Sequence, residues 1–469
     1  MGKSFTRPAL ASQSNTSRCP TCLTEELAGQ ADFRLHVAEP SRTLPFVLVS
    51  ARVSSAMRRL ALAGVTLMLV ACSAPQAPPA SIETRSAAPV SSRLNLVRAT
   101  VDAFAKAART GDRPAFDRLI SNRDPGFPDR ARLLYENLSS LPLTTLRMQV
   151  EPAEVALSDA RRKLLGPSAW RQRVIVTWRL AGDGDEVEHR VWLTFLEAGG
   201  EVRIAGAIDE PAGGLPEQKP SWWLGPSNAR ERGGVTVLAG SGQVLDRWAK
   251  LAAAALSNVR EQLPNGLGES WNRQVVIEVP ATSRDFETVL GKSAGSYAAI
   301  AAVTHRAGVA GDAIRIVVNP KAARLSSRDL QSVLEHEMVH VATRSPDTAA
   351  PMWAEEGMAE WVSMRAHPGQ RSGGTDELLL RVRSDGAPRS FPADRRFDAG
   401  ARNLELAYAE AWLACRFIAD RYSESQLGRF YAELADGNSL DQASRSILHL
   451  SETQLTAEWR AYLDRLARY

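Results

Sequence analysis

The segment 330–342 constrains this chain more than any other, because its apolar residues recur at helical spacing and two histidines stand four residues apart within it. A four-residue step places His336 and His340 one turn apart on the same face of a helix, where both imidazoles can bind one metal ion. Glu337 projects about 100° further around the helix axis, which puts a carboxylate beside that ion. The segment therefore predicts a helix that carries two metal ligands, His336 and His340, and a general base, Glu337.

The next segment, 351–361, adds a third acidic candidate. It contains the pattern Trp353-x-x-Glu356-Gly357-x-Ala359 on a second predicted helix. A histidine pair on an ordinary packed helix is the plain alternative for the first segment, since HExxH occurs by chance in about one of a hundred chains of this composition. The presence of both segments favours a metal site over that alternative.

Together the two segments resemble those of the gluzincins, the peptidase MA-like clan of thermolysin and the zinc aminopeptidases. The resemblance implies a mostly helical, thermolysin-like metallopeptidase domain with a small sheet over residues 220–469, which binds one Zn²⁺ per chain. It implies Glu356 as the third zinc ligand, because the glutamate before the glycine has that role in the clan. It also implies that Glu337 takes a proton from the zinc-activated water that attacks the scissile carbonyl.

The spacing of the acidic residues leaves one alternative open. Fifteen residues separate His340 from Glu356, fewer than in thermolysin, and by spacing alone Glu360 fits the third ligand better. Gluzincins often carry an acid four residues after the ligand that bonds a zinc-bound histidine. We therefore assign Glu356 as ligand, Glu360 as the outer partner of His336, and Glu355 as a solvated or cleft-facing acid.

Two further features are implied by the same resemblance. Tyr408 matches a tyrosine in the C-terminal helices of peptidase MA-like sequences, and we expect it to donate a hydrogen bond to the oxyanion. A tyrosine beside Trp412 can equally be a core residue. The strand predicted over 314–318 resembles the one whose edge pairs with extended substrate in this clan.

The segment 57–72 is typical of a secretion signal. Met57 is followed by two arginines and then by about a dozen apolar residues, a stretch too short to span a bilayer. It ends in Leu-Val-Ala-Cys72, which resembles the lipobox of bacterial lipoproteins. The resemblance implies cleavage before Cys72, lipid attachment to its thiol, and an extracytoplasmic protein anchored to the bacterial cell membrane.

Two flanking segments are interpreted in the light of that signal. Residues 1–56 precede a signal that belongs at an N-terminus, so we interpret them as a doubtful extension with Met57 as the true start. Residues 73–92 are rich in Pro, Ala and Ser and predict a tether.

Between 93 and 212 the sequence predicts helices followed by strands, and hence an α+β chain overall. Helical spacing covers 94–108, 114–120 and 128–138, whereas 144–157, 172–180, 187–196 and 201–208 are rich in strand-forming residues. Helices before a curved antiparallel sheet resemble the cone fold of nuclear transport factor 2 and ketosteroid isomerase. No acid is placed as in the isomerase, so a binding or spacer role is expected. Segments 211–216 and 220–226 predict a linker into the second domain.

Charge excludes one class of partner. After residue 72 the chain contains 49 basic and 49 acidic residues, so it has no basic surface of the kind that binds nucleic acid.

Three functions are compatible with these features of the sequence. The first is an endopeptidase that acts on a peptide or protein substrate in the cell envelope, since no Gly-x-Met-x-Asn segment precedes HExxH to capture a free N-terminus. The second is a catalytically silent, lipid-anchored scaffold on a peptidase fold, and the third is a zinc amidohydrolase that acts on a non-peptide envelope amide. A silent scaffold has no need of a base, and Glu337 therefore favours an enzyme.

Overall fold

The structure, a computed structural model, describes residues 90–181, 183–207, 216–240, 242–367 and 369–469. The predicted extension 1–56, the signal 57–72 with Cys72 and most of the tether 73–92 lie outside the described residues. Within the described ranges, no helix is both long enough and apolar enough to cross a bilayer.

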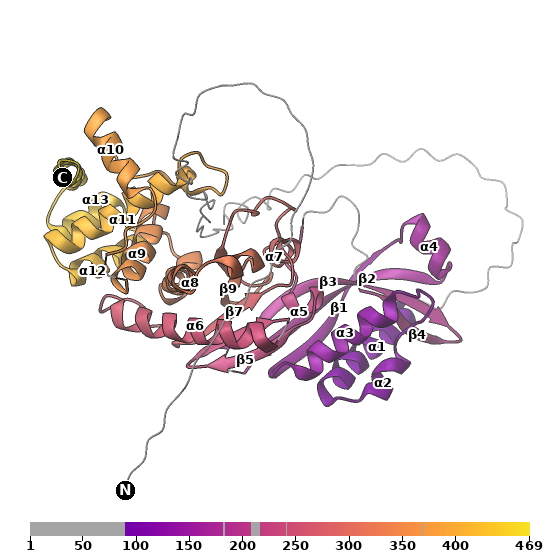
Figure 1. Cartoon of the computed structure of the whole chain (residues 1–469). Coiled ribbons are helices and arrows are strands. Elements are labelled where there is room, and N and C mark those ends of the chain that lie inside the picture. The colour runs from indigo at the N-terminus through magenta and orange to yellow at the C-terminus, as the bar shows by residue number, and fades with distance from the viewer. Residues whose placement is uncertain (1–89, 182, 208–215, 241, 368) are drawn as a thin grey trace, which may run out of the picture. The chain divides into compact units, whose positions relative to one another are not determined.

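The first part of the described chain is an antiparallel sheet with helices packed against it (Figure 1). Its helices are α1 (Val90–Thr110), α2 (Arg113–Arg118), α3 (Phe127–Ser140) and α4 (Asp159–Leu165). Its strands, in spatial order, are β1 (Leu143–Val155), β2 (Ala169–Leu180), β3 (Val187–Ala198) and β4 (Glu201–Gly206). The break between α1 and α2 is as predicted: Gly111 has φ 70°, and the carboxylate of Asp112 accepts a hydrogen bond from the Ala115 amide at 2.9 Å.

The second part contains a small mixed sheet followed by helices. Its strands, in spatial order, are β5 (Asn228–Arg232), β6 (Val235–Ala239), β7 (Val275–Val279), β9 (Ile314–Val318) and β8 (Ala302–Arg306). Strands β6, β7 and β9 run parallel, and the two edge strands β5 and β8 run antiparallel to their neighbours. The α+β class is confirmed: a sheet region comes first, and a mostly helical part with a small mixed sheet follows.

The prediction for 314–318 was wrong in one respect. Strand β9 lies between β7 and β8, so its edges are both paired within the sheet. The edge strand on that side is β8, which we do not predict from the sequence. In a sheet without β8, strand β9 would be the edge.

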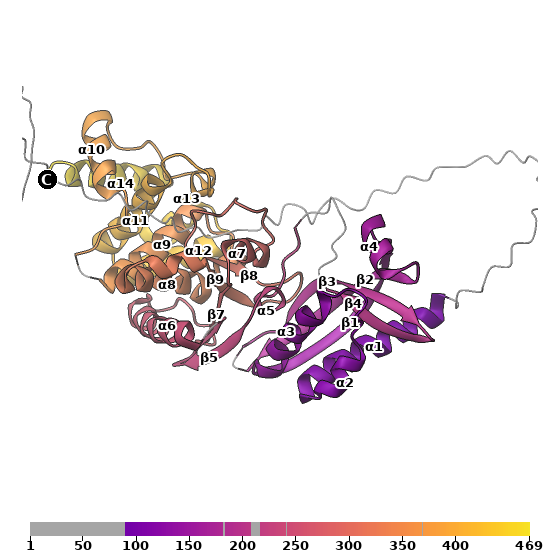
Figure 2. The same ribbon diagram turned by 45° about the vertical axis from the view of Figure 1, so that its right-hand side comes forward.

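Helices α8 (Ser327–Ala342), α9 (Met352–Arg365) and α11 (Leu404–Arg421) lie beside one another in both ribbon views (Figures 1 and 2). The other helices of this part are α5 (Ser221–Leu224), α6 (Gly242–Gln262), α7 (Ser283–Val289), α10 (Thr375–Asp385), α12 (Glu424–Ala435), α13 (Leu440–Ala443) and α14 (Glu452–Leu466). Short 3-10 turns cover Pro320–Arg324, Ser345–Asp347 and Asp394–Phe397, and a π turn covers Ser444–Leu448.

The segment 220–226, predicted as part of a linker, is a packed element. Trp222 and Trp223 of α5 are buried, and Trp222 meets Trp178 of β2 edge to face with ring centroids 5.6 Å apart. The same apolar cluster contains Ala307 and Ala313, which flank the turn between β8 and β9. One hydrophobic core is therefore built from both predicted domain ranges, 93–212 and 220–469.

Candidate metal centre

Helix α8 brings the two histidines together. The Ser326 hydroxyl caps its first turn by accepting from the Asp329 amide at 3.1 Å, and Leu330, Leu334 and Met338 are fully buried along its apolar side. Because this face is fixed by packing, His336 and His340 lie on the same side, with their Nε2 atoms 3.1 Å apart. The predicted helix and the predicted shared face are both present.

Helix α9 supplies the third group. Glu356 is fully buried, and its Oε2 lies 3.1 Å from His336 Nε2 and 3.4 Å from His340 Nε2. The next residue is Gly357, where a Cβ would collide with the carbonyl oxygen of Ala411 and lie 2.8 Å from the Cys415 sulfur. The absence of a side chain at Gly357 thus allows α9 to approach α11 closely. This close approach determines how deeply the neighbouring Glu356 is buried.

The three groups fit a tetrahedral metal ion. Ligand atoms about 2.1 Å from a tetrahedral centre stand about 3.4 Å from one another. The separations among His336 Nε2, His340 Nε2 and Glu356 Oε2 are 3.1, 3.1 and 3.4 Å. In the part of the chain that the structure describes, this is the one group of histidine, cysteine or acidic residues that could hold a metal ion.

The outer nitrogen of each imidazole faces a polar group. His336 Nδ1 makes an ion-pair contact of 3.2 Å with Glu360 Oε1, and His340 Nδ1 lies at hydrogen-bond distance, 2.9 Å, from the Ser345 hydroxyl. Such partners fix the ring orientation and the tautomer, so both Nε2 atoms are left to face inward. Glu360 lies on the far side of His336 from Glu356. Ser345 was missed, because nothing in its sequence neighbourhood marks it.

Glu337 is held on one side only. Its Oε2 accepts a hydrogen bond of 2.6 Å from the Thr304 hydroxyl, and its Oε1 is buried without a hydrogen-bond partner among the described residues. Burial raises the pKa of Glu337, while the two histidines and the Thr304 hydrogen bond act in the opposite direction. One oxygen is therefore anchored, and the other is available to a reacting group.

Tyr408 of α11 lies against the same site. Its ring centroid is 6.1 Å from that of His336, and its buried hydroxyl lies close enough to Glu356 for a hydrogen bond. Burial and the carboxylates of Glu356, Glu337 and Glu360 raise its pKa well above the usual value. Tyr408 therefore stays protonated and can act only as a hydrogen-bond donor or as a packing residue.

Charge balance within the metal-free group follows the same geometry. Burial by itself lowers the pKa of His336, but hydrogen bonds and charges from Glu356 and Glu360 outweigh it and raise that pKa to about 10. Burial likewise favours protonated Glu356, yet His340 and His336 hold its pKa at about 2. In the absence of an ion the two acids thus favour the protonated form of His336, and a metal ion, which binds neutral imidazole, competes with that proton.

The prediction for Glu355 was wrong. This residue is 1% exposed, and its Oε1 accepts a hydrogen bond of 2.7 Å from Thr348. We expected a solvated or cleft-facing acid because Glu355 has no place in the metal set. Residues 352–363 of α9 are all buried, and Glu355 is buried with them.

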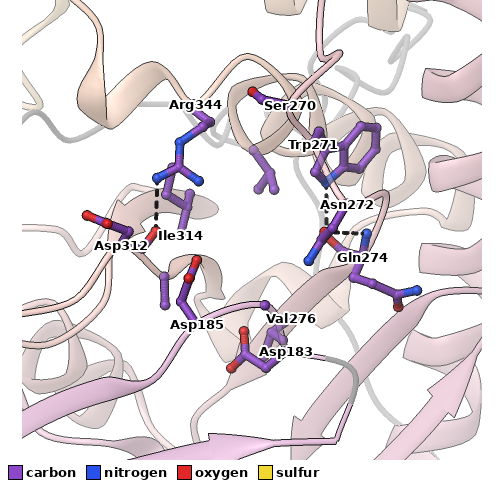
Figure 3. A pocket seen from close by; sticks show the side chains of 13 residues that line it. Asp183, Asp185, Ser270, Trp271, Asn272, Gln274, Val276, Asp312, Ile314 and Arg344 are labelled. Atoms are coloured by element: carbon purple, nitrogen blue, oxygen red, sulfur yellow. Dashed lines mark hydrogen bonds between the residues drawn. The ribbon is translucent and has the colours of Figure 1, made fainter.

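A cavity near the site is separate from it. It has a volume of about 500 Å³ and is lined by Asp183, Asp185, Trp271, Asn272 and Arg344, among others (Figure 3). The cavity reaches the end of α8 but includes none of the three groups of the metal centre. Those groups and Glu337 are fully buried, so in this conformation they are shielded from solvent.

Comparison with protein-family models gives no match for this sequence, and comparison with curated proteins gives none either. The function of this chain must therefore be inferred from the geometry of the centre and from the residues that form it.

Proposed function

We propose that this chain is a zinc-dependent peptidase of the gluzincin type, most simply an endopeptidase. The observation that carries the proposal is the triangle of His336 Nε2, His340 Nε2 and Glu356 Oε2, whose sides match a tetrahedral ion. Two imidazoles and one carboxylate are the donor set of catalytic zinc sites that keep a fourth position open. One Zn²⁺ per chain is the cofactor that follows.

The chain's own residues divide the remaining work. A zinc ion held by His336, His340 and Glu356 would supply Lewis acidity to activate water. Glu337, whose Oε1 has no hydrogen-bond partner among the described residues, would accept a proton from the attacking water and return it to the leaving amine nitrogen. Tyr408 donates a hydrogen bond to the carbonyl oxygen as negative charge develops on it. Glu360 and Ser345 hold the two imidazoles in register throughout.

The proposed substrate is an extended peptide that adds to the outer edge of β8, whose residues 302–305 are buried in this conformation. This strand is the sheet edge next to the centre, since Thr304 on it contacts Glu337. Extended peptides bind such edges through main-chain hydrogen bonds. Because the centre is shielded in this conformation, residues that cover it must move before substrate enters.

Two observations favour an enzyme over a silent scaffold. Glu337 follows the ligand His336 directly in the chain, and its Oε1 is buried without a hydrogen-bond partner among the described residues. A buried acceptor left unpaired costs on the order of 1 to 3 kcal/mol, which a scaffold has no reason to tolerate.

We propose the cell envelope as the place of action. The support for this is the sequence of 57–72, with a basic start, an apolar run and a lipobox-like end at Cys72. On this proposal the mature chain is anchored by lipid outside the cytoplasmic membrane of a bacterium and meets its substrates there.

The proposal is tested by metal analysis coupled to digestion of a peptide library with the zinc-loaded and the chelator-treated chain. We expect about one zinc per chain and internal cleavage that disappears on chelation. A chain without metal would remove the enzyme proposal. Metal with cleavage confined to non-peptide amides would place the chain among the amidohydrolases, and metal without any hydrolysis would leave the scaffold.

A further inference from the structure

We propose that Thr304 is a positioning residue for Glu337, and that the N-terminal sheet keeps it in place through the β8–β9 hairpin. This inference rests on the proposed peptidase function. It assigns to the sheet region a part in setting the geometry of the catalytic base, beyond the binding or spacer role that its fold suggests.

Thr304 joins the edge strand to the catalytic helix. It is fully buried, and its hydroxyl lies 2.6 Å from Glu337 Oε2 and 3.0 Å from the backbone carbonyl oxygen of the same residue. A hydroxyl has one hydrogen to donate, and the shorter contact to a carboxylate is the stronger of the two. The direction of the Glu337 carboxylate therefore depends on where β8 lies.

The position of β8 is fixed by residues 307–313, the turn that connects it to β9. Within this turn the amide of Val309 donates to the carbonyl oxygen of Glu188 at 2.7 Å, at the start of β3. Gly308 and Gly311 have φ of 77° and 99°, and a Cβ at either would collide with the carbonyl oxygen of Glu188 or Glu186. The hairpin thus docks on the N-terminal sheet backbone to backbone, at positions where only glycine fits.

A buried ion pair reinforces this docking from the side. Arg315 of β9 is fully buried, pairs with Asp183 from the β2–β3 loop, and donates to Glu278 of β7 at 3.1 Å. Its guanidinium stacks over Trp178 of β2, 4.1 Å from the ring centroid. Removing one partner of such a buried pair is costly, so β9 is held firmly against the first sheet.

The hairpin is the part that reaches both the first sheet and the catalytic helix. In Figure 3 the cavity separates Asp183 and Asp185 from Arg344 at the end of α8, while Asp312 of the hairpin stands beside Arg344. The Arg344 guanidinium donates to the Asp312 carbonyl oxygen at 3.1 Å. Arg306, the last residue of β8, pairs with Asp347, two residues after the Ser345 that bonds His340. Displacement of the hairpin would therefore disturb the base Glu337 through Thr304. It would also disturb the ligand His340, through the segment that contains Asp347 and Ser345.

The first experiment replaces the hydroxyl in the full chain. Thr304→Val keeps the shape of the side chain, and Thr304→Ser keeps the donor. We expect Thr304→Val to lower kcat about 10 to 100-fold with little change in KM and with zinc content unchanged, as for loss of an outer partner. Thr304→Ser should recover most of the rate. Wild-type kcat in Thr304→Val would overturn the role of Thr304.

The second experiment moves the hairpin from the side of the first sheet. Gly308→Ala introduces the collision with Glu188, and Gly386→Ala is the matched control, with φ of 82° and no atom within 4 Å of its new Cβ. We expect Gly308→Ala to speed amide hydrogen exchange in β8 and to lower kcat, and Gly386→Ala to do neither. Asp183→Asn, a milder change that weakens the hold on Arg315, should have the same direction of effect should Gly308→Ala fail to fold.

Hydrogen exchange can be measured on the metal-free chain, which separates this inference from the proposed function. If wild type binds no zinc, the peptidase proposal fails, yet faster exchange in β8 would still establish the link to the first sheet. If Gly308→Ala and Asp183→Asn leave both the exchange of β8 and the rate at the level of Gly386→Ala, the N-terminal sheet does not position Thr304 and the inference is wrong.

Discussion

His336 Nδ1 lies 3.2 Å from Glu360 Oε1, on the opposite side of the imidazole from the nitrogen that faces Glu356. The two acids of α9 thus contact the two different nitrogens of one ring. Because only Nε2 also faces His340, the arrangement gives Glu356 and Glu360 different roles that substitution can separate.

We expect Glu356→Ala to lose the metal, since it removes one of three protein ligands. Glu360→Ala should keep the metal with affinity or activity weakened about 10 to 100-fold, the usual effect of losing an outer partner. Elemental analysis and a competition titration on both variants check this, with Glu360→Gln as the conservative control. A loaded Glu356→Ala beside an empty Glu360→Ala would show that the two assignments should be exchanged.

Glu337→Gln should retain about one zinc per chain and lose at least about 100-fold in turnover. The amide cannot accept the proton, while the three metal groups are left intact. Zinc content and peptide turnover must be measured on the same preparation, so that loss of metal is not mistaken for loss of the base. Substantial turnover in a loaded Glu337→Gln would assign the base to another residue.

Gly357→Ala tests the close approach of α9 and α11. In an open helix this change stabilises by about 0.5 to 1 kcal/mol, but here the new methyl group would collide with Ala411. We therefore expect destabilisation of about 1 to 3 kcal/mol, the usual cost of overpacking, in urea unfolding of the metal-free chain. Gly373→Ala, where no atom lies within 4 Å, is the surface control. A stabilised Gly357→Ala would show that the helices are further apart.

Acid should weaken the junction between the two sheets through His305. Burial lowers the pKa of His305 from 6.5 to about 4, with Arg315 acting in the same direction and Glu278 against it. Between these two values the unfolded chain binds more protons than the folded one, so the free energy of unfolding falls as pH drops from 6.5 to about 4. His189 is buried nearby with its pKa also well below 6.5 and adds to the trend.

His305→Leu should remove up to about 3 kcal/mol of that pH dependence, since one pKa unit corresponds to about 1.4 kcal/mol. The measurement is urea unfolding between pH 4 and 7, with His449→Asn, a change at an exposed histidine, as control. An unaltered slope in His305→Leu would mean that the pKa of His305 is the same in the folded and the unfolded chain.

In the native host we expect the mature chain to begin at lipid-modified Cys72 and to fractionate with membranes. Cys72→Ser should release it to the soluble fraction or leave the signal uncleaved, because the acyl chains provide the anchoring. Intact-mass analysis checks the N-terminus. Residues 1–56 on the secreted protein would overturn both the start at Met57 and the anchor.

Those parts of the site that depend on local geometry could be predicted from sequence. His336, Glu337 and His340 follow from helical periodicity within a few residues, and Glu356 from a second helix close by. Thr304 could not be predicted, since it reaches Glu337 across 33 residues by tertiary packing. Strand β8 has only five residues and begins within an alanine-rich run, 298–302, whereas the neighbouring 314–318 consists mostly of Ile and Val, so the sequence indicates a sheet edge at 314–318.

Burial of the ligand groups has a kinetic consequence. His336, His340 and Glu356 are each 0% exposed, so a chelator cannot touch an ion held there while the helices stay packed. The ion can leave only during a local opening of α8, α9 and α11. The free energy of such an opening does not depend on the concentration of chelator in solution. At high chelator concentration the rate of metal loss should therefore reach a maximum equal to the rate at which the helices open. The residence time of the ion then measures that opening rate.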